Sequence, residues 1–238
     1  MNCKNCNEEV KQNFCPNCGQ ATKIIRIDGQ YIAHEIGQIL NFDRGILYTI
    51  KELLIRPGIN IRHFISENRN RLVKPIVFII VTSLIYSMIN HFFHIEDGYI
   101  NFEEAKESTT GSIFKWVQNH YGYANIIMGL FIAFWTKLFF RKYNYNYFEI
   151  LILLCFIMGI GMLFFSVFAI FQALTHFDLM QIAGFIGLVY SAWAIGQFFD
   201  KSKFLNYVKA FFSYLLGLIT FTIVAILIGT LIDLIIKF

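Results

Sequence analysis

The sequence predicts an all-α membrane protein with about five transmembrane helices, and three observations lead to this prediction. Hydrophobic residues make up 56% of the 238 residues and charged residues only 15%, whereas an average soluble domain is about 25% charged. The apolar residues concentrate in the last two-thirds of the chain, in stretches long enough to cross a bilayer. Four of the five cysteines fall within the first eighteen residues, which are polar. A small polar head is therefore expected to precede a membrane domain.

The N-terminal cysteines form two pairs, Cys3 with Cys6 and Cys15 with Cys18, with two residues between the members of each pair. Each pair lets two thiolates reach one ion from a tight turn, and together they supply the four sulfur ligands that Zn²⁺ accepts. The spacer of eight residues is shorter than in the longer zinc-ribbon signature, so residues 1–22 are predicted to form a minimal zinc ribbon. A four-thiolate site is coordinatively closed and therefore structural. Iron in the same site is the alternative.

The first residues also indicate the compartment of the head. The start, MNCKNCNEEV, lacks the apolar stretch that a signal peptide requires. The N-terminus is therefore expected in the cytosol, where clustered cysteines are typically metal ligands and not disulfides. A redox role is the alternative, but a thioredoxin-like cysteine pair requires a surrounding βαβ unit. Cys155 lies in an apolar segment and is interpreted as a small buried hydrophobe.

Residues 23–71 are predicted to form a linker and amphipathic helices that are cytoplasmic or interfacial. Helical spacing of apolar residues predicts three stretches, at about 31–40, 44–55 and 59–67. Asp43 is expected to cap the second stretch. Pro57 is expected to end it, because proline disfavours a helical conformation at the residue before it.

The region between residues 41 and 74 is basic, with seven Lys or Arg against three Asp or Glu. Basic amphipathic helices beside a membrane span often lie in the headgroup plane. The alternative is that these helices pack on the cytoplasmic ends of the spans. Nucleic acid is not expected as a partner, because the basic residues alternate with apolar ones and no nucleic-acid-binding motif is present.

A transmembrane domain is predicted over residues 72–238. Its five spans are predicted at about 73–93, 123–140, 150–174, 179–199 and 208–236. The positive-inside rule orients them: basic residues precede the first span, Arg141 and Lys142 follow the second, and Lys201 and Lys203 separate the last two. The segment between the first two spans is acidic. This pattern predicts a cytoplasmic N-terminus and a C-terminus on the opposite side.

Small residues four positions apart favour close packing of the predicted helices. Ala192 with Gly196 and Ala225 with Gly229 have this spacing. The contacts are expected within the bundle, and a homo-oligomer held by the same residues is the alternative.

Several sequence segments together resemble a known family. They are the Cys-Pro-Asn-Cys-Gly-Gln run, Asp43–Thr49, Leu53–Gly58, Asn68–Arg71 and Lys74-Pro75. This combination resembles an uncharacterised bacterial family of zinc-ribbon-headed multispan membrane proteins, which is a domain of unknown function. The resemblance covers about residues 3–90. It implies a zinc-binding head on a protein of the bacterial cytoplasmic (inner) membrane, and it implies no activity.

The sequence favours a non-enzymatic scaffold or regulatory protein whose ribbon contacts a cytoplasmic protein partner. No metalloprotease, nucleophile-elbow or Walker motif is present, so catalytic residues are not expected. The alternative is a transporter or channel component. No charged residue falls at a predicted mid-membrane position, where ion and proton pathways usually have one.

Overall fold

The computed structural model describes residues 2–3, 5–11, 13–19, 45–93, 109–175 and 177–236. The chain divides into two compact units, Met1–Asn41 and Phe42–Phe238. The predicted helical stretch at 31–40, the predicted cap Asp43 and most of the acidic segment after the first span lie outside the described residues.

The described part of the second unit is helical. Its helices are α2 (Ile46–Ile55), α3 (Pro57–Ser66), α4 (Pro75–Phe93), α5 (Thr109–Asn119), α6 (Tyr121–Phe139), α7 (Tyr147–Thr175), α8 (Met180–Asp200) and α9 (Phe204–Ile236), with a 3-10 turn at Arg141–Tyr143. Five of them, α4, α6, α7, α8 and α9, are long and apolar enough to cross a membrane. This confirms the predicted all-α membrane fold.

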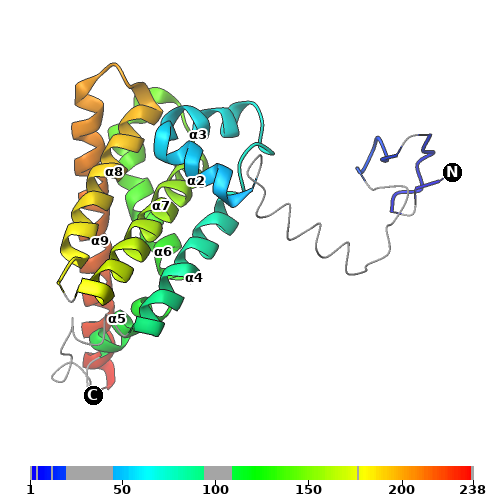
Figure 1. Ribbon diagram of the computed structural model, residues 1–238. Helices are drawn as coiled ribbons and strands as arrows, with labels where there is room; N and C mark the ends of the chain where they lie inside the picture. Colours follow the sequence, from blue (N-terminus) through cyan, green and yellow to red (C-terminus); the bar gives the residue numbers. More distant parts are fainter. Residues whose placement is uncertain are drawn as a thin grey trace. The chain divides into compact units, whose positions relative to one another are not determined.

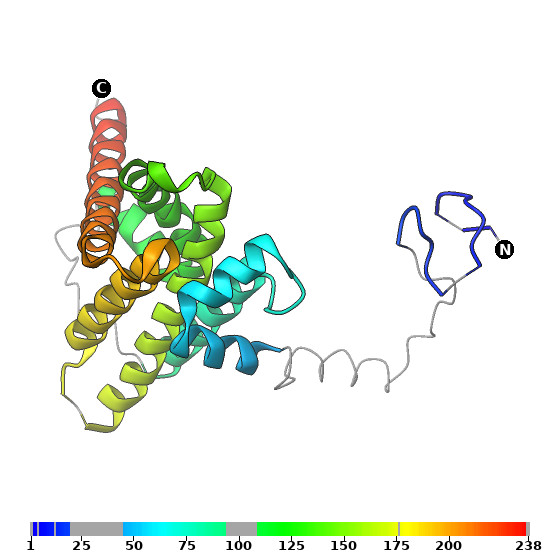
Figure 2. The same cartoon turned by 90° about the horizontal axis from the view of Figure 1, so that it is seen from above.

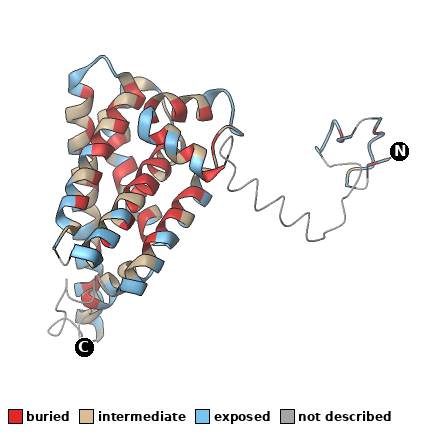
Figure 3. Cartoon of the chain, in the orientation of Figure 1, coloured by how far each residue is buried: buried red, intermediate tan, exposed pale blue. Residues whose placement is uncertain are grey.

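The spans α6, α7, α8 and α9 form a ring in which each helix packs against its two neighbours (Figure 2). α4 lies outside this ring and packs mainly along α7 and also against α6. Buried residues face the interior of this assembly, and exposed residues cover its outer faces (Figure 3). Aromatic side chains fill much of the interior, with the ring of Phe156 lying 5.8 Å from Phe78 and 5.3 Å from Phe64.

α2 and α3 pack on the end of the bundle at which α8 leads into α9, and α5 lies near the opposite end (Figure 1). The guanidinium of Arg62 donates a hydrogen bond to the carbonyl of Phe198 (3.1 Å), and the hydroxyl of Tyr190 donates to the carbonyl of Leu53 (3.1 Å). Of the two placements predicted for these helices, packing on the spans is therefore observed. Leu54 and Ile55 of α2 stay exposed, so the same helix also presents an apolar edge.

Asn60 joins α2 to α3. Its side-chain amide donates 3.0 Å hydrogen bonds to the carbonyls of Glu52 and Arg56, which also accept the backbone N–H groups of Arg56 and Asn60, respectively. Pro57 occupies the first position of α3, where its missing N–H costs no helical hydrogen bond. The buried Asn60 side chain thus adds two hydrogen bonds to the backbone hydrogen bonds that hold the turn between the two helices.

Replacing Asn60 with leucine is expected to destabilise the protein by about 1–3 kcal/mol, because both hydrogen bonds of the buried side-chain amide are lost. Thermal unfolding of the purified full chain in detergent measures this effect. Asn68→Leu is the matched control, since Asn68 is exposed. Equal melting temperatures for the two variants would contradict the role given to Asn60.

The helix α5 was not predicted, because the sequence indicated only an acidic segment there. Its first residue, Thr109, donates its backbone N–H to Asp233 of α9 at 2.9 Å, and its hydroxyl donates to the same carboxylate. A carboxylate at a helix N-terminus stabilises unpaired N–H groups and the helix dipole. The cap of α5 therefore comes from a residue far away in the sequence.

Gly159, Gly196 and Gly229 are among the glycines that allow close helix contacts within the bundle. A Cβ atom on Gly159 would lie 2.7 Å from the ring of Phe78, one on Gly196 would lie 2.5 Å from Tyr207, and one on Gly229 would lie 2.7 Å from Thr110. Two of these glycines belong to the predicted small-residue pairs, whose packing is thus intramolecular. A homo-oligomer stays a prediction.

Candidate functional site

The backbone of the N-terminal unit is arranged as two tight turns, one at each cysteine pair. In the first, the N–H of Cys3 donates to the carbonyl of Glu8 (2.8 Å), and Asn7 adopts a left-handed conformation with φ 60°. In the second, the N–H of Gly19 donates to the carbonyl of Cys15 (2.9 Å), and Gly19 has φ 73°. Asparagine and glycine are the residues that tolerate this conformation best. The sequence thus places turn residues where both cysteine pairs need them.

These turns bring together all four sulfur atoms predicted as metal ligands. The Sγ atoms of Cys3, Cys6, Cys15 and Cys18 lie within 4.8 Å of one another. Cys3 pairs with Cys18 and Cys6 with Cys15, each at 3.5 Å. Contacts therefore cross between the two turns, so each turn contributes to both sulfur pairs.

The sulfur spacing fits a tetrahedral metal site. A Zn–S bond of about 2.3 Å places the sulfurs of a regular tetrahedron about 3.8 Å apart, which lies between the closest and the longest separations observed. The same spacing is far above the S–S bond of about 2.04 Å in a disulfide, and none of the five cysteines is disulfide-bonded. The four cysteines can hold one metal ion, and they leave no coordination position for a substrate.

Clustering disfavours the thiolate form of Cys6 in the absence of a cation. A backbone hydrogen bond with Glu8 lowers the pKa of Cys6, but the neighbouring thiols, with Cys18 first, and partial burial outweigh it and raise this pKa to about 12. A bound cation reverses this balance because it stabilises four thiolates together. Metal binding is therefore coupled to the release of protons.

The affinity for metal is expected to fall as the pH is lowered from about 8 to about 6, because protons compete with the metal for the thiolates. The sign follows from the raised pKa of Cys6: without the metal its thiol holds its proton over this range, and that proton must leave before the metal binds. Competition with a coloured chelator at several pH values measures this. A constant affinity across this range would contradict ligation by the cysteine thiolates.

A second polar constellation holds α2 to the start of α4. The guanidinium of Arg71 donates to the hydroxyl of Tyr48 (3.1 Å) and to the carboxylate of Glu52 (3.2 Å). The hydrogen bond with Tyr48 and then the negative charge of Glu52 raise the pKa of Arg71. The N–H of Val73 donates to the buried hydroxyl of Thr49 (3.1 Å). These bonds fix the segment that leads into the first span.

Sequence reasoning missed the polar groups inside the bundle. Asn125 of α6 and Ser83 of α4 are both buried, and the Asn125 amide donates to the Ser83 hydroxyl at 3.3 Å. Asn125 also borders a cavity of about 270 Å³ within the ring of α6, α7, α8 and α9, together with Ser191 and Tyr214. The position of Asn125 inside the predicted span 123–140 was the available signal, because a polar amide in a membrane helix needs a partner.

The cavity within the ring exists because three glycines do not serve close packing. A Cβ atom on Gly161 or Gly187 would meet nothing within 4 Å, and one on Gly184 would meet only Phe165 at 3.9 Å. All three line the cavity, together with the methionines Met128, Met158 and Met162. Some glycines of α7 and α8 therefore allow close helix packing, and others leave space for the cavity.

Comparison with known proteins identifies similarity over one segment. The family model described as a protein of unknown function (DUF3667) matches residues 43–87. This segment contains α2, α3 and most of α4, including the Asn60 and Arg71 contacts. No curated protein and no solved structure matches the chain.

Proposed function

We propose that this protein is a multi-pass protein of the bacterial cytoplasmic membrane whose N-terminal unit binds one Zn²⁺ ion and recognises a cytosolic protein partner. The observation that carries this proposal is the convergence of the sulfur atoms of Cys3, Cys6, Cys15 and Cys18 in a compact unit separate from the bundle. A closed four-sulfur set suits a structural ion. Zinc is proposed in preference to iron because a closed tetrahedral set of four thiolates is the usual arrangement of structural zinc sites.

An exposed aromatic side chain supports recognition by the head. Phe14 directly precedes Cys15, and 63% of its surface is exposed. In a unit this small, which has few apolar side chains to form a core, an exposed phenylalanine is unexpected. Metal-ordered turns hold such a side chain in place without a large core. Exposed aromatic residues in a fixed position are typical anchors of protein interfaces. Phe14 is therefore the proposed contact residue.

The test is affinity co-purification from native membranes at matched expression. Wild type is compared with Cys15→Ser/Cys18→Ser, which removes the ion, and with Phe14→Ala, which keeps all four cysteines. Cys155→Ser is the control for the loss of a cysteine elsewhere. A protein that is retained by wild type and Cys155→Ser and lost in both other variants supports the proposal. Identical partner profiles for all four proteins would overturn it.

The proposed orientation places the N-terminus and the packed helices α2 and α3 in the cytosol. The basic residues that precede α4, follow α6 and separate α8 from α9 support it, because the alternation of the spans brings these segments to one end. Fusions of alkaline phosphatase and of green fluorescent protein after Phe238 test it. Phosphatase activity with a dark fluorescent fusion is expected, and the reverse pattern would place the C-terminus in the cytosol.

The cavity within the ring of α6, α7, α8 and α9 favours a second candidate function, that of a transporter or channel component. Its polar groups, Asn125, Ser191 and Tyr214, lie among apolar side chains, as in many sites for small molecules. Solute uptake into vesicles containing the purified protein distinguishes the two. Uptake that Gly187→Leu blocks would favour transport over partner binding.

A further inference from the structure

We propose that the groove between α4, α6 and α7 holds one acyl chain of an anionic phospholipid as a resident ligand. The groove has a volume of about 350 Å³, within the range of small-molecule sites, about 300–1,000 Å³. Its walls come from three helices that are each long and apolar enough to span a membrane. The site is independent of the metal-binding head.

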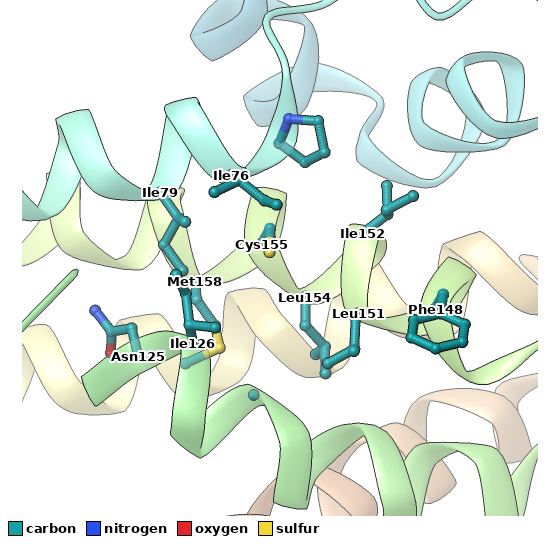
Figure 4. A pocket seen from close by; sticks show the side chains of 12 residues that line it. Ile76, Ile79, Asn125, Ile126, Phe148, Leu151, Ile152, Leu154, Cys155 and Met158 are labelled. Atoms are coloured by element: carbon teal, nitrogen blue, oxygen red, sulfur yellow. The ribbon is translucent and has the colours of Figure 1, made fainter. Parts of the chain in front are cut away.

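The shape of the groove follows from how α4 and α6 meet. They approach closely at Gly122, where an added Cβ atom would lie 3.7 Å from Ser83, and at the Asn125–Ser83 hydrogen bond. Towards the first turns of α4 they leave a space whose floor is α7, with Leu151, Cys155 and Met158 facing it (Figure 4). The result is a space that Asn125 borders where α4 and α6 meet.

The chemistry of the lining selects a hydrocarbon. Asn125 is the one lining residue with a polar side chain, and its amide donates to Ser83. An ordered water molecule needs two to four polar partners, which this lining does not offer. Moving a hydrocarbon chain from the bilayer into the groove costs no desolvation free energy, because both environments are apolar. It gains dispersion contacts with a wall that would otherwise have no partner atoms.

The entrance of the groove fits a lipid that comes from the surrounding bilayer. Ile76 of α4 is 58% exposed and Phe148 of α7 is 72% exposed, and both border the groove. Lys74 is exposed and directly precedes Pro75, which also lines it. A basic residue at the rim of an apolar groove complements an anionic headgroup whose chain lies inside.

The test is photo-crosslinking of the full chain reconstituted in vesicles of phosphatidylglycerol or of phosphatidylcholine, each with a diazirine in one acyl chain. Crosslinked residues are mapped by mass spectrometry. Labelling at Cys155 and Met158 is expected, because lipid outside the groove does not reach the floor. Labelling restricted to outward-facing residues, such as Ile223 and Leu227 of α9, would overturn the proposal without any variant.

Two groove-filling variants sharpen the test. Gly129→Leu and Cys155→Leu add volume to the lining, so labelling at Met158 is expected to fall about ten-fold, which corresponds to about 1.4 kcal/mol, while labelling at Leu227 stays constant. Constant labelling at Leu227 also shows that α9 is inserted in the variants, and an unchanged Tm shows that they are folded. Unchanged labelling at Met158 in both variants would contradict the proposal.

The proposed preference for an anionic headgroup is tested by comparing the two lipids. Wild type is expected to be labelled at Met158 more strongly by phosphatidylglycerol than by phosphatidylcholine, and Lys74→Gln is expected to lose this preference. Equal labelling by both lipids in the wild type would overturn the selection of an anionic lipid.

Discussion

Replacing Gly58 with alanine is expected to detach α3 from α8 and to destabilise the bundle strongly. A Cβ atom on Gly58 would lie 2.5 Å from the backbone nitrogen of Phe198 and also overlap the backbone of Gln197. Helix backbone does not rotate aside as a side chain does, so α3 must move away. The nearby Arg62–Phe198 hydrogen bond is then lost as well. The expected cost is about 3 kcal/mol, the upper end for overpacking.

Thermal unfolding of the purified protein measures this cost, with an expected fall in Tm of roughly 6–12 °C for a chain of this size. Gly161→Ala and Gly187→Ala are matched controls, because their new methyl groups enter open space. These two are expected to keep or slightly raise Tm, since alanine favours a helix by up to about 1 kcal/mol over glycine. Similar Tm changes for all three variants would show that helix propensity determines Tm, and not the contact of residue 58 with α8.

Replacing Cys15 with serine is expected to abolish metal binding and to unfold the N-terminal unit. A unit this small lacks a hydrophobic core of its own: Cys3, Val10 and Cys15 are its buried apolar residues among those described. Its stability therefore comes from the ion, for which structural zinc sites provide about 10–16 kcal/mol. Elemental analysis is expected to show about one zinc per chain in the wild type and almost none in the variant.

Limited proteolysis separates the effects on the two units. Cleavage within residues 1–19 is expected to accelerate in Cys15→Ser and after treatment of the wild type with a chelator, while Tm of the bundle stays constant. Cys155→Ser is the control and is expected to keep its zinc. Full zinc content in Cys15→Ser would remove Cys15 from the ligand set.

The features predicted from sequence are those whose physical cause is local. Five spans were predictable because the hydrocarbon core demands about 20 apolar residues in a row, whatever the neighbouring helices are. The cysteine cluster was predictable because two residues between cysteines suffice to aim both thiolates at one ion. The end of α2 before Pro57 was predictable for the same reason, since proline acts on the adjacent residue.

The features that were missed depend on residues far apart in the chain. α5 begins where Asp233, 124 residues away, caps it, and nothing near Thr109 indicates that partner. The glycines show the same limit: Gly159 touches Phe78, while Gly161, two positions later, faces open space. Their sequence spacing is equally compatible with packing and with a cavity. The neighbouring helix decides between the two.

The length of α9 ties the protein to the thickness of its membrane. With 33 residues it is about 50 Å long, whereas the hydrocarbon core measures about 30 Å and α4 and α6 have only 19 residues each. α9 must therefore tilt or project, and hydrophobic mismatch sets by how much. Because Asp233 near its end caps α5, a thicker bilayer that makes α9 more upright also moves α5. The position of α5 is therefore expected to depend on bilayer thickness.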